Sequence, residues 1–227
     1  VTPPGMICCA SAKNASDLSN EIMLPLIDKP IIQYIVEEFV AAGIKDIIIV
    51  TSWDHRAVED HFDNSVELEL YLEKNEKEKQ LEEIKRIADM ANFTFVHQKG
   101  PYGNGTPCLN VESMVGKEPF VYAFGDDLVL SDRPFTRDLM DAYQKKPGIY
   151  FGVQKVARKE VDRYGIAQLK SNGDEHEVEY FVEKPAVHEA PTNLAEFGRF
   201  ILEPEIFQAL RDVCRIKGGE LQLGDAV

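Results

Sequence analysis

The sequence has few cysteines, a deficit of positive charge and no long apolar run. Only 4 of its 227 residues are cysteine, none of them in a Cys-x-x-Cys pair or beside a histidine. This usage argues against a zinc site and a disulfide framework, and it is typical of a reducing compartment. The 39 acidic residues outnumber the 25 basic ones, and the formal net charge is −14. That charge argues against nucleic acid as a partner, because a phosphate backbone binds basic surfaces.

The chain also lacks an apolar stretch of the length that spans a bilayer, which is roughly 20 residues. Residues 6–10 are apolar but too few for the core of a signal peptide, and no basic segment precedes them. We therefore expect a cytoplasmic protein with no membrane partner. The histidines are scattered, and no serine or cysteine lies in a nucleophile motif, so no catalytic triad is predicted.

The most informative feature present is the turn Gly125-Asp126-Asp127, which ends the apolar run 119–124. The run is short, aromatic and β-branched and does not alternate, which predicts a strand buried on both faces. Ligands of open α/β folds bind at the carboxyl edge of the sheet, where these carboxylates would lie. Carboxylate oxygens are suitable ligands for Mg²⁺. The alternative is a solvated Asp-Asp turn that only ends the strand.

From Pro30 onward helical and strand patterns alternate. Helices are predicted from a first turn at Pro30 up to a stop at Gly43, as a pair within 67–91, after Gly105, at 135–144 and at 204–213. Strands are predicted at 46–50, 93–96, 149–156, 166–169, 178–182 and 195–202. Asn172-Gly173 is a strong hairpin signal between two of these strands. The order predicts an α/β fold with a Rossmann-like mixed, mostly parallel sheet flanked by helices. Residues 1–20 show no sustained period, and no first buried strand is predicted there.

Three other features could bind a ligand, and each also has a plain structural explanation. The loop 98–105 has two glycines whose N–H groups could approach a ligand, although ordinary turns use glycine as well. Lys184 precedes a proline at a strand end and is therefore expected to be extended, either toward a phosphate or into solvent. Asp225 could join Asp126 at a metal, but spacing alone does not bring the two together.

These segments together resemble the sugar-phosphate nucleotidyltransferases, and among them the bacterial UTP–glucose-1-phosphate uridylyltransferases. The matching stretches follow one another from residue 23 to the end of the chain: 23–30 (MLPLIDKP), 33–34, 43–51, 59–62, 98–105, 125–127 (GDD), 164–166 (YGI), 182–185 (VEKP), 190–195 (APTNLA), 198–199 (GR) and 218–226. The predicted helical pair within 67–91 is typical of the uridylyl branch and generally absent from thymidylyl relatives. The resemblance therefore favours UTP and glucose 1-phosphate over dTTP.

The resemblance implies that Mg²⁺ bridges the phosphates while glucose 1-phosphate directly attacks the α-phosphorus of UTP. Pyrophosphate leaves and UDP-glucose forms, in a reaction that depends on positioning and charge neutralisation. By the same resemblance Asp126 and Asp225 hold the metal, and Lys184 reaches the sugar phosphate. The substrate contacts that it implies are Gln98 and Gly103 at the uracil end and Gly165, Glu183 and Gly198 around the glucose.

Residues 1–22 depart from the family pattern, whereas 23–227 match a nucleotidyltransferase core that we expect to be truncated at its C-terminal end. The family opens with a Gly-x-Gly-Thr-Arg loop and a catalytic lysine just before Met-Leu-Pro. This chain has no such loop, and Glu21 stands at the place of the lysine. A frameshift or a wrong start upstream of Met23 would explain the difference, and the alternative is a natural replacement loop. Two functions are therefore considered: an active enzyme, with a homo-oligomer as one of the states open to it, and a catalytically inactive relative that binds UDP-sugars or regulates a partner.

Overall fold

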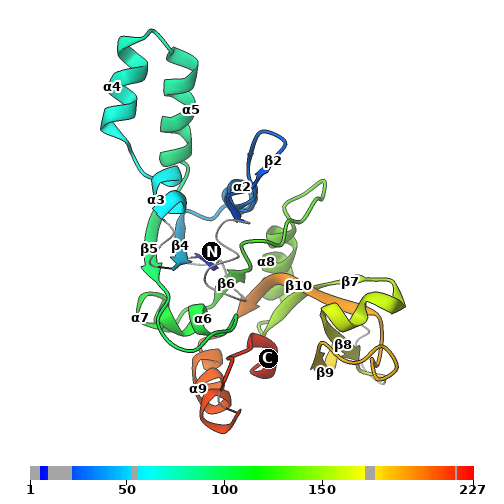
Figure 1. Ribbon diagram of the computed structural model, residues 1–227. Coiled ribbons are helices and arrows are strands. Elements are labelled where there is room, and N and C mark those ends of the chain that lie inside the picture. Colours follow the sequence, from blue (N-terminus) through cyan, green and yellow to red (C-terminus); the bar gives the residue numbers. More distant parts are fainter. Residues whose placement is uncertain (1–5, 10–21, 53–55, 172–176, 218) are drawn as a thin grey trace.

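The computed structural model describes residues 6–9, 22–52, 56–171, 177–217 and 219–227. Figure 1 shows two groups of strands that meet near the middle of the molecule. The bounds of the helices, including two short 3₁₀ helices, are α2 (Ile31–Ala42), α3 (Arg56–Phe62), α4 (Val66–Lys74), α5 (Glu78–Ala88), α6 (Thr106–Asn110), α7 (Glu112–Val115), α8 (Phe135–Lys145), η1 (Arg158–Arg163), α9 (Glu205–Lys217) and η2 (Leu223–Asp225).

A parallel sheet forms the first group, in the order β1 (Met6–Cys9), β4 (Asp46–Thr51) and β5 (Asn92–His97). Ile47, Ile49 and Val50 of β4 are fully buried, as expected of a β-branched run without alternation. The small antiparallel pair β2 (Pro25–Leu26) and β3 (Lys29–Pro30) precedes α2.

The prediction that the N-terminal segment contains no first strand is wrong. Residues 6–9 form β1, which pairs in parallel with β4 in the register Met6 with Ile47. A four-residue apolar strand is too short to show a period, so the pattern gave no signal. Its partner explains its position, because an unpaired edge of β4 offers hydrogen-bonding groups to any apolar segment within reach.

The second group is antiparallel and is organised by the long strand β10 (Leu194–Leu202). This strand pairs with β6 (Phe120–Ala123), β7 (Tyr150–Lys155) and β8 (Gly165–Leu169), and β8 pairs with β9 (Val178–Glu183). Strand β6 also lies beside β1, so the two groups are neighbours. The mixed α/β class is confirmed, but parallel pairing among the described strands is confined to β1, β4 and β5. The other strands are antiparallel because β10 crosses the second group and β8–β9 returns as a hairpin.

Strand β6 is buried on both faces, as predicted. Val121 and Ala123 belong to a core shared with α2 and α8, whereas Phe120 and Tyr122 belong to a core shared with α9. The prediction for α2 is also confirmed: it ends at Gly43, whose φ of 97° is left-handed. The hairpin turn predicted at Asn172-Gly173 lies outside the described residues.

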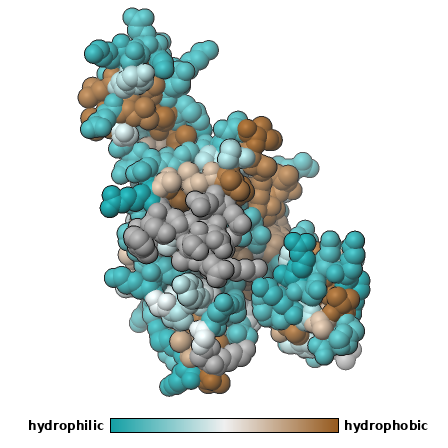
Figure 2. Space-filling view, viewed as in Figure 1, coloured by the Kyte–Doolittle hydropathy of each residue, from teal (hydrophilic) through white to brown (hydrophobic). Residues whose placement is uncertain are grey.

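The charge-rich segment forms an arm of two antiparallel helices, α4 and α5, that projects from the body (Figure 1). The Ser65 hydroxyl accepts a hydrogen bond from the Leu68 N–H and begins α4 as a cap. Apolar side chains are visible on the arm in Figure 2, and Leu68 and Leu70 are exposed. No described helix has both the length and the apolar composition that a bilayer span requires.

Candidate active site

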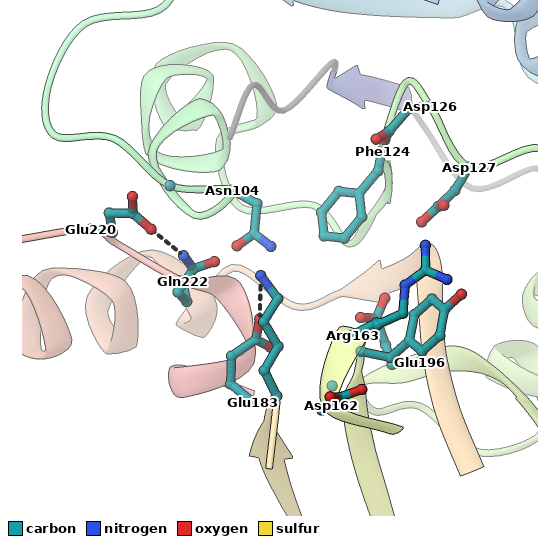
Figure 3. Close-up of a pocket in the computed structure, with 14 residues that line it drawn as sticks. Asn104, Phe124, Asp126, Asp127, Asp162, Arg163, Glu183, Glu196, Glu220 and Gln222 are labelled. Atoms are coloured by element: carbon teal, nitrogen blue, oxygen red, sulfur yellow. Dashed lines mark hydrogen bonds and ion pairs between the residues drawn. The ribbon is translucent and has the colours of Figure 1, made fainter. Parts of the chain in front are cut away.

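The carboxyl end of β6 opens into a cleft of about 520 Å³ whose lining also includes residues of β8, β9, β10, the loop after β5 and the C-terminal segment. Figure 3 shows side chains from several separate segments pointing into it. The cleft is lined by Gly103, Asn104, Phe124, Asp126, Asp127, Asp162, Arg163, Tyr164, Gly165, Glu183, Lys184, Glu196, Glu220 and Gln222. Six of these fourteen residues are Asp or Glu, so any anionic ligand needs a counter-cation here.

The two carboxylates after β6 have different surroundings. Asp127 Oδ2 accepts a hydrogen bond of 2.7 Å from the Gly198 N–H, and the Gly198 carbonyl accepts one of 3.0 Å from the Phe124 N–H. These bonds fasten the turn to β10. Asp126 is exposed on the cleft surface. Asp127 therefore shapes the turn, while Asp126 faces the space where a ligand would bind.

A buried ion pair supports this turn from behind. Arg199 is fully buried and donates to Glu38 Oε2 of α2 over 2.8 Å. The other oxygen of Glu38 accepts from the N–H of Thr136 in the first turn of α8. The guanidinium also lies over the ring of Phe39, with its carbon 5.1 Å from the centroid. One arginine thus links α2, α8 and β10 next to Asp127.

The glycine loop and the C-terminal segment, far apart in the sequence, are joined by backbone hydrogen bonds. Gly105 N–H donates to the Leu221 carbonyl over 2.8 Å, and Leu221 N–H donates to the Tyr102 carbonyl over 2.7 Å. A Cβ on Gly103, whose φ is 118°, would lie 2.2 Å from the Leu221 carbonyl oxygen. The glycine is therefore required by the close approach of this second segment, which sequence reasoning had not identified.

Asn104 extends the same junction toward η2, the helix that contains Asp225. Its Oδ1 accepts a hydrogen bond of 2.6 Å from the Leu223 N–H, and its carbonyl accepts one from the Tyr122 hydroxyl. Asn104 itself lines the cleft. The segment that carries Asp225 is consequently anchored at the rim of the cleft.

Strands β8 and β9 supply the opposite wall. The Phe181 ring leaves no room for a side chain at Gly165, where a Cβ would lie 1.9 Å from it. Lys184 Nζ lies 3.8 Å from the carboxylate of Glu183, the last residue of β9, which Figure 3 labels in the cleft. This wall therefore provides an ammonium group for an anionic ligand.

The expectation that Lys184 is extended is wrong, because its φ is 43°. Its N–H donates to the Tyr164 carbonyl over 3.1 Å. This tertiary contact across η1 and β9 overrides the local preference of a residue before proline.

Glu196 is the most unusual acid of the cleft. Its Oε1 is buried and has no hydrogen-bond partner among the described residues. Burial first, and then the carboxylates of Asp127 and Glu183, raise the pKa of Glu196 well above its ordinary value. Loss of the proton from Glu196 is therefore less favourable than from an exposed glutamate.

The structure brings together five of the eight residues expected at the site: Gly103, Asp126, Gly165, Glu183 and Lys184 all line the cleft. Gly198 lies directly behind it and bonds Asp127. Gln98 and Asp225 are not among the lining residues. Glu21 lies outside the described residues. Sequence reasoning missed Asn104, Arg163 and Glu196. Asn104 stands in the loop 98–105, where only the glycines and Gln98 were singled out, and Arg163 and Glu196 lie outside the stretches that match the family.

Across the described residues, no group of three or more His, Cys, Asp or Glu side chains is arranged to hold a metal ion. Mg²⁺ usually binds through one or two carboxylates and completes its coordination with water and substrate phosphates. The exposed carboxylate of Asp126 in the acidic cleft fits that use, with the phosphates contributed by a nucleotide.

Comparison with known proteins gives the site a context. Residues 16–227 match the family model described as nucleotidyl transferase. A UTP–glucose-1-phosphate uridylyltransferase of Bacillus subtilis is 47% identical over 206 residues, which cover 90% of this chain and 70% of that protein. A second from Staphylococcus saprophyticus is 46% identical over the same length, covering 90% of this chain and 71% of that protein.

Two solved structures have the same fold. One is a UDP-glucose pyrophosphorylase complexed with UDP-glucose, with a TM-score of 0.83 and 35% identity, covering 98% of this chain and 85% of that one. The other is a UTP-bound UGPase from Acinetobacter baumannii, with a TM-score of 0.85 and 31% identity, covering 99% and 81%. The chain therefore belongs to the nucleotidyl transferase family and, within it, to the UTP–glucose-1-phosphate uridylyltransferases.

Proposed function

We propose that the protein forms UDP-glucose and pyrophosphate from UTP and glucose 1-phosphate. The strongest support for this proposal is that four separate segments meet in one cleft. They lie around residues 103, 126, 165 and 184, and the family resemblance assigns all four to this reaction. The relatives named for the same reaction match nearly the whole chain. The solved structures bound to UDP-glucose and UTP support the assignment of those ligands.

The reaction requires two negatively charged substrates to approach each other inside an acidic cleft. Lys184 and Arg163 are the basic side chains that line it. Lys184 would neutralise the phosphate of glucose 1-phosphate, and its neighbour Glu183 would accept hydrogen bonds from the sugar hydroxyls. Fixed charges of this kind lower the barrier to phosphoryl transfer mainly by positioning and electrostatic stabilisation.

Asp126 and Asp225 are the residues that would hold Mg²⁺, each with one carboxylate. When bound, the ion neutralises phosphate charge and polarises the phosphate that is attacked. Gly103 would lie at the uracil, together with Gln98 if the base extends beyond the lining of the cleft. Gly165 and Gly198 would lie at the glucose.

A second candidate function rests on the sequence of residues 1–22. This segment has no Gly-x-Gly-Thr-Arg loop, and Glu21 stands at the place of the family lysine. A carboxylate beside a departing pyrophosphate would oppose transfer, by about 3 kcal/mol if its effect equals the loss of one electrostatic donor. The alternative is therefore a relative that binds UDP-sugars without turnover.

The test is the initial rate of pyrophosphate release with four substrate pairs. UTP or dTTP is combined with glucose 1-phosphate or galactose 1-phosphate, each with and without Mg²⁺. The proposal expects the fastest release with UTP and glucose 1-phosphate in the presence of the metal. Binding of UDP-glucose without release from any pair would instead support the second candidate.

The remaining parts of the assignment are also proposals. We place the protein in the cytoplasm of a bacterial-type cell, where UTP is available and free cysteines persist. We treat 23–227 as the catalytic core and 1–22 as an atypical N-terminal segment, of which residues 6–9 add β1 to the sheet. A homo-oligomer is expected from the family, and light scattering of the purified chain would test it.

A further inference from the structure

Glu196 occupies a position in which a carboxyl group has little to stabilise it. It lies on β10 between the main cleft and a small apolar recess, and it lines both. The recess is formed largely by the rings of Phe124, Phe151, Phe181 and Phe200. An aliphatic side chain would fill such a place without an unmet hydrogen bond.

The charges around Glu196 do not compensate it. The carboxylates of Asp127 and Glu183 are the groups that influence it electrostatically, and both repel a negative charge. Lys184, the nearby cation on the same wall, is directed to Glu183. A neutral carboxyl group has an O–H to donate, and no described residue accepts it at Oε1.

A ligand atom is the partner that the cleft can supply. A phosphate is a poor match, because two further carboxylates lie close by. A sugar hydroxyl is uncharged and accepts a hydrogen bond readily. Glu196 also lines the same wall as Gly165 and Glu183, which the proposed function places at the glucose.

We propose that Glu196 is a specificity-determining residue whose buried carboxyl group forms a hydrogen bond with a hydroxyl of the hexose. The inference rests on the proposed function, because the hexose is the glucose of UDP-glucose. It goes further by assigning the sugar selectivity to a side chain outside the motifs of the family resemblance.

The test compares the binding of UDP-glucose and of UDP by titration calorimetry with Mg²⁺ present. Glu196→Val removes the carboxyl group and keeps a good strand former. Glu196→Gln keeps a donor of the same shape. Glu179→Gln is the matched control, because Glu179 is exposed on the adjacent part of the sheet and does not line the cleft. Thermal melting of each variant establishes that it folds.

Glu196→Val is expected to weaken UDP-glucose binding roughly tenfold, the value of one hydrogen bond, and to leave UDP binding unchanged. Glu196→Gln and the control are expected to bind both nucleotides about as the parent does. Three results would overturn the inference. Glu196→Val could bind UDP-glucose as tightly as the parent does, or its affinity for UDP could fall as much as its affinity for UDP-glucose. Glu196→Gln could also lose as much affinity for UDP-glucose as Glu196→Val does. If the parent binds UDP but not UDP-glucose, the proposed function fails together with it.

Discussion

Replacement of Arg199 by methionine offers the sharpest test of how the turn at the cleft is supported. The side chain is fully buried, and its removal leaves Glu38, only 12% exposed, without its ion-pair partner. Removing one member of a buried pair costs about 3–5 kcal/mol, because the remaining charge stays desolvated. For a chain of this length that loss corresponds to a fall in Tm of roughly 6–20 °C.

Urea unfolding followed by circular dichroism would measure the loss, and two further variants define its origin. Arg215→Met deletes an exposed arginine that pairs with Asp212 on the same helix, and it should cost less than about 1 kcal/mol. The double variant Arg199→Met/Glu38→Leu removes both buried charges and should regain most of the stability. About 1 kcal/mol should remain lost, because Thr136 N–H no longer has its acceptor.

The reasoning would be refuted if Arg199→Met cost no more than Arg215→Met. It would also be refuted if the double variant were no more stable than Arg199→Met alone. The first result would mean that the guanidinium contributes no more than a surface charge, and the second that the unpaired Glu38 is not the cause of the loss.

Three other substitutions have defined outcomes. Asp126→Asn should abolish Mg²⁺-dependent turnover while Tm stays within a few degrees of the parent, and turnover near the parental rate would exclude a metal role. Gly103→Ala should destabilise the fold by at least about 1 kcal/mol in urea, because its φ is 118° and a Cβ would meet the Leu221 carbonyl. Glu196→Gln should remove a pH dependence of stability. The pKa of Glu196 is raised in the folded state, so the folded protein still holds this proton at pH values above 4.5, the ordinary glutamate pKa, at which the unfolded chain has released it. The free energy of unfolding of the parent therefore falls by up to about 1.4 kcal/mol per pH unit as the pH rises from 4.5 toward the pKa of the folded state. Urea unfolding at several pH values should show this fall in the parent and not in Glu196→Gln.

Local chemistry was sufficient to predict most of the described elements. Gly43 ends α2 because the left-handed position it occupies favours glycine. The apolar run 119–124 gave β6 because a strand buried on both faces needs no alternation. Asp126 could be placed at the cleft from its position after that strand.

Features that depend on distant partners could not be predicted in this way. Strand β1 is defined by the edge of β4 that it covers. Lys184 departs from the extended conformation through a bond to Tyr164. The burial of Arg199 depends on Glu38, which is 161 positions away in the chain. The sequence around Glu196 predicts only a strand residue. Its unusual surroundings come from aromatic rings and carboxylates on other segments.

The most direct test of the account is ³¹P NMR of this chain incubated with UTP, glucose 1-phosphate and Mg²⁺. The proposed function predicts that UDP-glucose and pyrophosphate appear in equal amounts, and only when both substrates and the metal are present. A folded sample that binds UDP-glucose but leaves the phosphorus signals of both substrates unchanged would contradict it.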